Sequence, residues 1–269
     1  MKDKVVIVTG ASSGIGKALA FEFAQRGAKL VLAARSLDKL KEVEQKLTQM
    51  NAESISVRTD VSVEEDCQNL VDKTLEKYDR IDVLVNNAGI SMRALFNDME
   101  LSVMKKLMDV NFWGTVYCTK YALPHLLETK GSVVGVISIA GYIGLPARTG
   151  YSASKFAIRG FLDTLRVENL KTGLHVLVAA PGFTASNVRN VALTADGSSQ
   201  GETPRDESKM MSAEECARLI TNAVVKRKRE LIMTFVEGKF TVWLNKWWPS
   251  LLEKLSYNHM AKEPDSPLK

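Results

Sequence analysis

The stretch Lys4-Val-Val-Ile-Val-Thr9-Gly10-Ala-Ser-Ser-Gly14-Ile-Gly16-Lys-Ala-Leu-Ala20 places a glycine-rich turn between an apolar, strand-like run and the start of a helix. Gly10 lets the backbone turn sharply, Gly14 lets it approach a ligand closely, and Gly16 lets the helix pack against the strand. The free amides at a helix start bind anions. The stretch therefore predicts a pyrophosphate-binding turn, although glycine-rich turns also serve ordinary strand-to-helix connections.

Strand-like and helix-like segments alternate along the rest of the chain. We expect strands over 4–9, 28–34, 54–59, 81–86, 132–138, 174–180 and 230–234. We expect helices over 14–26, 36–50, 64–78, 100–128, 150–171 and 212–226. This order predicts a single-domain α/β Rossmann fold, a doubly wound parallel sheet of about seven strands with helices on both faces. Ligands of such sheets bind at the carboxyl ends of the strands.

A proton-transfer site is indicated by Tyr151 and Lys155, which lie four residues apart, and by Ser138, which ends the apolar run before them. Residues four apart share a helix face, so the ammonium of Lys155 can lie beside the phenol of Tyr151. A nearby cation lowers a tyrosine pKa from its ordinary value of about 10. Such a phenol can protonate an alkoxide or deprotonate an alcohol near neutral pH. Taken alone, the pair also fits an amphipathic helix without any chemistry.

Four motifs stand in order along the chain: Thr9-Gly-x-x-x-Gly-Ile-Gly16, Asn86-Asn-Ala-Gly89, Ser138 before Tyr151-x-x-x-Lys155, and Pro181-Gly182. With them, most of the chain resembles the short-chain dehydrogenase/reductase family of the Tyr-x-x-x-Lys type. Within that family it looks most similar to the hydroxysteroid dehydrogenase and acyl-dihydroxyacetone-phosphate reductase branches. The features that carry this finer likeness are Ser138-Ile-Ala-Gly141, Tyr151-Ser-Ala-Ser-Lys-Phe156 and the basic, tryptophan-rich C-terminus.

The resemblance implies a catalytic set of four residues. Tyr151 would deliver a proton to a substrate carbonyl oxygen while nicotinamide supplies hydride to the carbon, and Ser138 would hydrogen-bond and orient the same oxygen. Lys155 would bind the nicotinamide ribose and hold the tyrosine pKa low. Asn111 matches the family's fourth catalytic position and would hold a water that relays protons from the lysine. An asparagine side chain within a helix is otherwise unfavourable. Taken alone, Asn111 also fits a polar helix residue or a helix cap.

The resemblance also implies the positions that bind the cofactor. Asp60 would accept a hydrogen bond from the adenine amino group, and Val61 would pack on the ring. The full set is Gly10, Ser12, Ser13, Gly14, Ile15, Gly16, Arg35, Ser36, Asp60, Val61, Asn87, Ala88, Gly89, Tyr151, Lys155, Pro181, Gly182, Phe183 and Thr184. Residues 87–89 would line the ribose and nicotinamide, and residues 181–184 would close over the carboxamide. Taken singly, each also fits ordinary turn chemistry at a strand end.

The end of the second expected strand favours NADP(H) over NAD(H). An NAD-selective crevice carries a carboxylate there, about twenty residues past the glycines, for the ribose 2′-hydroxyl. This chain instead has neutral Ala34 followed by Arg35 and Ser36. A guanidinium binds phosphate in a fork, so Arg35 is expected to hold the 2′-phosphate. A solvated arginine at a helix start is the alternative, and Ser13 stands where some NADP enzymes carry a second basic residue.

Composition fits one enzyme domain. The 269 residues are 45% hydrophobic, and no linker or repeat divides them. We expect a catalytic domain over 1–234 and a C-terminal amphipathic extension with a polar tail over 235–269. The apolar runs are too short for a membrane-spanning helix, and the first is too short for a secretory signal. The cysteines and histidines lie far apart in sequence, which predicts reduced thiols, a cytoplasmic location and no catalytic metal.

Two further segments bear on the substrate. The connection over 183–211, rich in Ser, Gly, Asp and Asn, predicts a lid on the substrate, with Ser91, Met92 and Leu95 on the opposite wall.

In the C-terminal extension, apolar residues recur at helical spacing: Phe240, Trp243, Leu244, Trp247, Trp248, Leu251, Leu252 and Leu255. Lysines lie among them and a basic run, 226–229, precedes them. We therefore expect 235–260 to form a partly exposed apolar surface for a membrane interface or for the entrance of a lipophilic substrate. Packing on its own domain or on a partner subunit is the alternative, and Pro249 splits the helix or starts its second half.

Two classes of protein therefore remain. The favoured class is an NADP-dependent oxidoreductase that interconverts a carbonyl and a secondary alcohol on a hydrophobic, lipid-like or steroid-like small molecule. The other class is a catalytically silent nicotinamide-binding regulatory or scaffold protein, against which the catalytic set argues. We expect a homodimer or homotetramer. The net charge of +5 comes without a recognition motif, so no nucleic-acid partner is expected.

Overall fold

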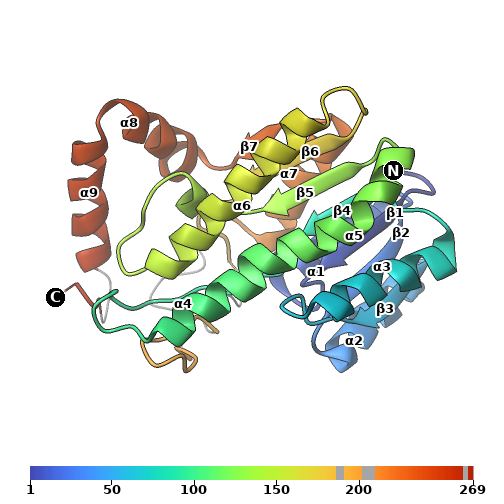
Figure 1. Ribbon diagram of the computed structural model, residues 1–269, viewed down its shortest axis with the longest axis horizontal. Helices are drawn as coiled ribbons and strands as arrows, with labels where there is room; N and C mark the ends of the chain where they lie inside the picture. The colour runs from blue at the N-terminus through green and yellow to red at the C-terminus, as the bar shows by residue number, and fades with distance from the viewer. Residues whose placement is uncertain (186–190, 202–209, 263–265, 269) are drawn as a thin grey trace.

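The structure, a computed structural model, describes residues 1–185, 191–201, 210–262 and 266–268. Within these residues one parallel sheet of seven strands runs in the order β3-β2-β1-β4-β5-β6-β7 (Figure 1). The strands are β1 (Val5–Thr9), β2 (Lys29–Ala34), β3 (Ser54–Arg58), β4 (Val83–Asn86), β5 (Ser132–Val136), β6 (His175–Ala180) and β7 (Glu230–Ile232). The predicted doubly wound α/β fold is confirmed.

The main helices are α1 (Gly14–Gln25), α2 (Leu37–Gln49), α3 (Glu64–Tyr78), α4 (Leu101–Leu107), α5 (Gly114–Glu128), α6 (Thr149–Glu168) and α7 (Ala213–Val225). Strand β1 shows why both sheet faces are covered, because it is fully buried and its side chains alternate between two cores. Val5 and Ile7 pack with residues of α3, α5 and α6, whereas Val6 and Val8 pack with residues of α1, α2 and α7. Helix α6 ends at Glu168, three residues before the expected end.

The strand order reverses between β1 and β4, which are hydrogen-bonded neighbours. The chain leaves β1 toward β2 and β3, and after β4 it continues on the other side toward β5, β6 and β7. At such a switch point the connections diverge and leave a crevice at the carboxyl ends of the strands. The glycine-rich turn after β1 and residues 87–89 after β4 therefore face the same crevice.

Helix α4 continues into α5 through η1 (Met108–Trp113), one turn of π-helix. The wider turn of a π-helix is uncommon and is often found at functional sites. Asn111 lies within it and is completely buried. The interrupted helix thus directs this side chain into the protein.

The connection between β6 and α7 is less irregular than its composition suggested. Leu193 pairs with the segment after β4, through hydrogen bonds from Leu193 N to Ser91 O (2.9 Å) and from Arg93 N to Leu193 O (2.8 Å). Glu100 N also donates to Ala195 O at 2.9 Å. The expected lid over 183–211 therefore contains a docked section, 191–201, whereas 186–190 and 202–209 lie outside the described residues.

The C-terminal helical segment, defined here as residues 235–262, consists of η4 (Phe235–Phe240), α8 (Thr241–Trp247) and α9 (Pro249–Ala261). Pro249 is the first residue of α9, so it starts the second helix rather than kinking a single one. Figure 1 shows α9 beyond the carboxyl ends of the strands. The basic run 226–229 instead directly precedes β7, so it lies at the amino ends of the parallel strands, away from α9. In the parts of the chain that are described, no helix is long and apolar enough to cross a bilayer.

Candidate active site

The glycine-rich turn has the geometry of a ligand cradle. Gly10 and Gly14 adopt positive φ angles of 67° and 51°, which side chains with a Cβ rarely adopt. A Cβ on Gly16 would lie 2.2 Å from the Gly10 carbonyl oxygen and 2.5 Å from Asn87 Nδ2. The start of α1 therefore packs directly on the turn, and its amides face the crevice.

Hydrogen bonds join the turn to the end of β4. The Thr9 hydroxyl accepts bonds from the amides of Asn87 and Ala88, both at 3.0 Å, and donates to Val85 O at 3.2 Å. The Asn87 side chain donates to Thr9 O at 2.9 Å. These bonds fix the two strand ends that flank the switch point, so the cradle is rigid before any ligand binds.

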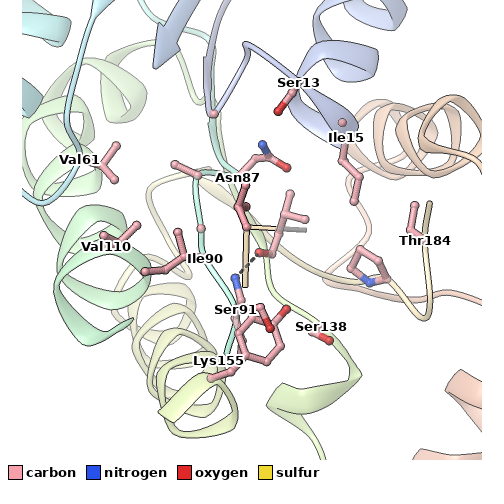
Figure 2. Close-up of a pocket in the computed structure, with 18 of the residues that line it drawn as sticks. Ser13, Ile15, Val61, Asn87, Ile90, Ser91, Val110, Ser138, Lys155 and Thr184 are labelled. Atoms are coloured by element: carbon pink, nitrogen blue, oxygen red, sulfur yellow. Dashed lines mark hydrogen bonds between the residues drawn. The ribbon is translucent and has the colours of Figure 1, made fainter. Parts of the chain in front are cut away.

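A cavity of about 630 Å³ opens at this edge of the sheet. Every residue of the expected cofactor set lines it except Gly16, which packs beneath the turn. Figure 2 shows Ser13 and Ile15 at one side of the cavity, a group of Val61, Ile90 and Val110 at another, and Lys155 near Ser91 and Ser138. The structure thus brings together residues that follow six separate strands.

The residues expected to transfer protons, Ser138, Tyr151 and Lys155, all line the cavity. Lys155 is buried, its Nζ lies 5.7 Å from the centroid of the Tyr151 ring, and it donates to Val136 O at 3.1 Å. Burial lowers the pKa of Lys155 to about 8. The Ser138 oxygen accepts a bond from Ala140 N at 3.2 Å, which leaves the hydroxyl proton to be donated elsewhere. The site can therefore present a phenol, a hydroxyl and an ammonium to one small ligand.

Asn111 lies behind these residues rather than in the cavity wall. Its Oδ1 accepts a bond from Ile90 N at 2.8 Å, and its Nδ2 donates to Ile90 O at 3.0 Å and to Ser154 Oγ at 2.9 Å. Ser154 in turn donates to Tyr151 O at 2.7 Å. A Cβ on Gly89 would lie 3.1 Å from Asn111 Oδ1 and 3.4 Å from Lys155 Nζ, so only glycine fits comfortably between them.

The expected adenine end is also ordered. The Asp60 Oδ1 atom accepts bonds from the amide and the hydroxyl of Ser62, at 3.1 and 2.7 Å. Val61 is held by close packing, because a Cβ on Gly114 would lie 2.7 Å from its Cγ2. The Asp60 carboxylate and the Val61 side chain are therefore fixed in orientation. Recognition of a flat polar ring requires such fixed groups.

The structure adds basic and apolar residues that sequence reasoning missed. Lys39, one turn into α2, lines the cavity together with Arg35 and Ser36. The wall also includes Leu145 and Arg148, which sequence reasoning missed, Val191, Leu193 and Ser199 of the expected lid, and Met260. Met260 belongs to α9, so the C-terminal helical segment forms part of the site. Lys39 lies in the first turn of the helix that begins just after Arg35 and Ser36, which was a signal for the first addition. Met260 falls within 235–260, the segment that we expected to serve lipid or the entrance of a lipophilic substrate.

One expectation for the substrate wall is partly wrong. Ser91 lines the cavity as expected, but Met92 and Leu95 do not. Met92 is completely buried in a separate small core with Val103, Leu107 and Leu193. Because successive residues of an extended segment point to opposite sides, a wall that exposes Ser91 must turn Met92 away.

A parallel sheet that carries a glycine cradle and a buried lysine beside a tyrosine defines a dinucleotide-dependent oxidoreductase. A model of the short chain dehydrogenase family matches residues 4–196. The chain therefore belongs to the short-chain dehydrogenase family. It is an NAD(P)-dependent enzyme that acts on CH–OH groups.

Two curated relatives extend this likeness over nearly the whole chain. The 11-beta-hydroxysteroid dehydrogenase-like protein 4A of Arabidopsis thaliana is 40% identical over 255 residues, which are 93% of this chain and 82% of the relative. Dehydrogenase/reductase SDR family member 7B of Mus musculus is 34% identical over an alignment of 271 positions, which covers 99% of this chain and 84% of the relative.

Solved structures agree on the fold. An alcohol dehydrogenase of the archaeon Thermococcus sibiricus, complexed with 5-hydroxy-NADP, has a TM-score of 0.75 and 26% identity, covering 86% of this chain and 96% of that one. A short-chain dehydrogenase/reductase of Burkholderia phymatum in complex with NAD has a TM-score of 0.78 at 24% identity, covering 96% and 93%. The second likeness, below 25% identity, concerns the fold alone, and membership of the short-chain dehydrogenase family supports a nicotinamide cofactor without distinguishing NAD from NADP.

Proposed function

We propose that this chain is an NADP(H)-preferring oxidoreductase that interconverts a carbonyl and a secondary alcohol on a hydrophobic, steroid-like or lipid-like substrate. The observation that carries the proposal is the buried ammonium of Lys155 beside the Tyr151 ring, at the end of a cavity built from the cofactor motifs. Tyr151 gives the substrate oxygen its proton, or takes it back in the reverse direction, and Ser138 orients that oxygen. A bound nicotinamide supplies or accepts the hydride.

The cavity fits such a cofactor. The glycine cradle would hold the pyrophosphate, because a helix start offers amide donors to an anion and Gly14 keeps a Cβ out of the way. Lys155 would hold the nicotinamide ribose hydroxyls. The buried Asn111 positions Ile90 and, through Ser154, the first turn of α6. A water relay from Lys155 past Asn111 is the further role that we assign to this amide.

The preference for NADP(H) rests on the charge at the end of β2. Arg35 and Lys39 both line the cavity beside Ser36, and no carboxylate replaces Ala34 at the strand end. Two cations favour a phosphate, whereas an NAD site places a carboxylate on the ribose 2′-hydroxyl. The lysine provides the second basic group that the position of Ser13 lacks.

The substrate class follows from the other end of the cavity. Leu145, Val191, Leu193 and Met260 give an apolar wall opposite the polar cluster of Ser91, Ser138 and Tyr151. A mostly apolar pocket with a few placed polar groups suits a compact hydrophobic ketone or alcohol. The name of the Arabidopsis relative, an 11-beta-hydroxysteroid dehydrogenase-like protein, supports steroid-like substrates among these.

The deciding experiment is a screen that follows NADPH absorbance over steroid, 3-oxoacyl and acyl-dihydroxyacetone-phosphate ketones, with Tyr151→Phe as the blank. We expect at least one ketone to be reduced by the wild type and none by the variant, while both bind NADPH. NADPH binding without turnover of any ketone would instead support the catalytically silent scaffold. Turnover retained by Tyr151→Phe would show that the proton donor is another group.

We also propose that the C-terminal helical segment contacts a membrane surface. Trp243, Trp247 and Trp248 are exposed by 49%, 60% and 55%, although tryptophan is usually buried. Of the apolar residues that recur at helical spacing there, only Leu244 and Leu252 are buried. An exposed aromatic face with lysines beside it matches an interfacial helix better than a self-packed one. The basic run 226–229 is no part of this surface, because it lies at the amino ends of the strands.

We also propose that the protein is cytoplasmic and forms a homodimer or a homotetramer. The three cysteines, Cys67, Cys118 and Cys216, are buried and free, as in a reducing compartment. Leu101 and Trp113, on α4 and the π-helical turn, are exposed by 64% and 43% and offer an apolar contact surface. Light scattering of the purified protein would give the oligomer size directly.

A further inference from the structure

The first turn of α6 carries Tyr151 but lacks an ordinary N-cap. Arg148 occupies the cap position with φ −134° and ψ 28°, and its side chain makes no capping hydrogen bond. Ala147 before it adopts a positive φ of 57°, an uncommon conformation for a residue with a Cβ. Two local bonds at this helix entry are long, from Leu145 N to Ser152 Oγ at 3.4 Å and from Arg148 N to Leu145 O at 3.2 Å, and contacts from elsewhere add to them.

Those contacts come from the extended segment 91–94, which follows the NNAG motif. The Arg148 Nη1 atom donates to Met92 O and lies 3.5 Å from Ser91 Oγ. Ala94 N donates to Ala147 O at 3.1 Å. The arginine side chain thus ties the helix start to this segment where a capping side chain would otherwise act.

The same segment is held at two further points. Ile90, just before it, is bonded through both its amide and its carbonyl to Asn111. Leu193 of the docked section pairs with Ser91 and Arg93 on the outer side. Residues 90–94 therefore link the buried asparagine, the helix start that carries the tyrosine, and the section 191–201 that lines the substrate end of the cavity.

We propose that Arg148 is a positioning residue that couples the docked section 191–201 to Tyr151. A guanidinium suits this role, because Nη1 carries two N–H donors and can hold the carbonyl of Met92 and the hydroxyl of Ser91 at once. Because Leu193 pairs with segment 91–94 and Arg148 bonds that segment to the first turn of α6, the position of the docked section bears on the position of Tyr151. The effect on turnover rests on the proposed function, whereas the mechanical coupling does not.

The test compares Arg148→Met and Arg148→Lys with a matched control, Arg227→Met. Arg227 also bridges two carbonyls, Lys130 O and Gly173 O, but at the amino ends of the strands. We expect Arg148→Met to lower kcat by up to about 100-fold, the cost of a misplaced catalytic group, with the NADPH dissociation constant unchanged. Arg148→Lys should recover part of kcat, and Arg227→Met should leave it unchanged.

Hydrogen exchange provides a readout that needs no turnover. In Arg148→Met, amides of 143–155 and of 191–201 should both exchange faster, although the two segments are distant in sequence. Faster exchange in only one of them, or in neither, would overturn the coupling even if the enzyme were active. If no ketone were reduced by the wild type, a joint increase would still support the coupling while the proposed function failed.

The cavity position of Arg148 offers a competing role, direct binding of an anionic group on the substrate. In that case Arg148→Met would raise KM for anionic ketones alone, with kcat and hydrogen exchange unchanged, and the positioning role would be wrong. Should Arg148→Met fail to fold, Ser91→Ala removes only one contact. It is expected to give a smaller change of the same pattern, and no change in kcat or in exchange would count against the proposal.

Discussion

The amide of Asn111 donates a hydrogen bond of 2.9 Å to the hydroxyl of Ser154, and both side chains are completely buried. The bond joins the π-helical turn to α6, one turn beyond the start of that helix. It accounts for an asparagine within a long helix, where its side chain is otherwise unfavourable. Every polar atom of this amide is satisfied by Ile90 or Ser154. The pair therefore fixes the distance between the π-helical turn and α6, the helix that carries Tyr151 and Lys155.

Removing the hydroxyl of Ser154 should therefore harm both stability and activity. Ser154→Ala leaves one N–H of Asn111 buried without an acceptor, which should cost about 1–3 kcal/mol in the free energy of unfolding. Denaturant unfolding and kcat measure the two effects. Ser152→Ala is the matched control, because its hydroxyl accepts only a long bond of 3.4 Å from Leu145 N. Equal losses for both serines would argue against a special role for the Asn111 contact.

The buried Lys155 should make the protein less stable than a variant without a charge there. Its pKa is about 8 in the folded state against 10.5 as the ordinary value, so the folded protein binds fewer protons between those pH values. Stability of the wild type should thus rise with pH across this window. Lys155→Met should be more stable at pH 7, by up to about 3 kcal/mol, and inactive. Unfolding measured from pH 7 to pH 10.5 should show this advantage shrinking; a constant difference would contradict the burial argument.

The cations at the end of β2 should discriminate between the two cofactors. Arg35→Ala should raise KM for NADPH much more than for NADH, since only NADPH offers a phosphate, and should cost about 1.5–3 kcal/mol in NADPH binding. Lys39→Ala should have the same sign and a smaller size, because an exposed ammonium makes no fork with phosphate. Lys41→Ala, on α2 but paired with Glu44, is the control. Equal losses for NADPH and NADH would exclude the phosphate role.

Two glycines should respond to alanine in opposite directions. Gly16→Ala would place a Cβ against the backbone of Gly10, so the turn must shift; we expect weaker cofactor binding and about 1–3 kcal/mol less stability. Gly160 lies within α6, and beyond the local backbone of that helix no atom of the described residues lies within 4 Å of the Cβ position. Gly160→Ala should stabilise the protein by about 0.5–1 kcal/mol through helix propensity. Thermal unfolding measures the stability of both variants, and NADPH titration measures their cofactor binding. If Gly16→Ala changed neither quantity, the glycine-rich turn would be able to shift without cost.

The strands, the helices and the cavity residues that follow strand ends depend on local sequence patterns, and most of these features were predicted from the sequence. Strand ends carry Gly10, Arg35, Asp60 and Ser138, and parallel strands deliver such ends to one edge, so the cavity could be assembled before the structure was known. The contacts that were not predicted are all between distant segments. Leu193 pairs with Ser91 without any strand-like pattern in either segment, and such pairing depends on where the two loops meet in space.

The C-terminal helical segment shows the same limit. Helical spacing of its apolar residues predicted the helices but not which side of them is covered. The structure buries Leu252 and Met260 of α9 and leaves Leu251 and Leu255 exposed, because the two sides of this helix face the protein and solvent respectively. Which side of α9 is buried could be predicted only from the position of this helix against the cavity, and the sequence pattern does not give that position.

Binding to anionic vesicles should depend on the three exposed tryptophans. The rings can enter a bilayer interface, while Lys239, Lys246 and Lys254 among them would each gain about 1 kcal/mol near an anionic surface. Lys246 already lies 5.6 Å from the Trp247 ring, so cation and ring would reach the interface together. Neutral vesicles should consequently bind less protein than anionic vesicles, and added salt should reduce the difference.

Co-sedimentation with liposomes separates this interaction from ordinary structural packing. The triple variant Trp243/Trp247/Trp248→Ser should lose vesicle binding while it keeps its unfolding temperature and oligomer size. A matched control, Val167→Ser with Leu170→Ser, removes two apolar side chains that are exposed by 65% and 73% near the end of α6 and should bind vesicles normally. If the intact protein bound no vesicles, or if the tryptophan variant unfolded or dissociated, the rings would serve packing or assembly. Because α9 contributes Met260 to the cavity, vesicle binding by the intact protein would place the substrate end of the site at the membrane surface.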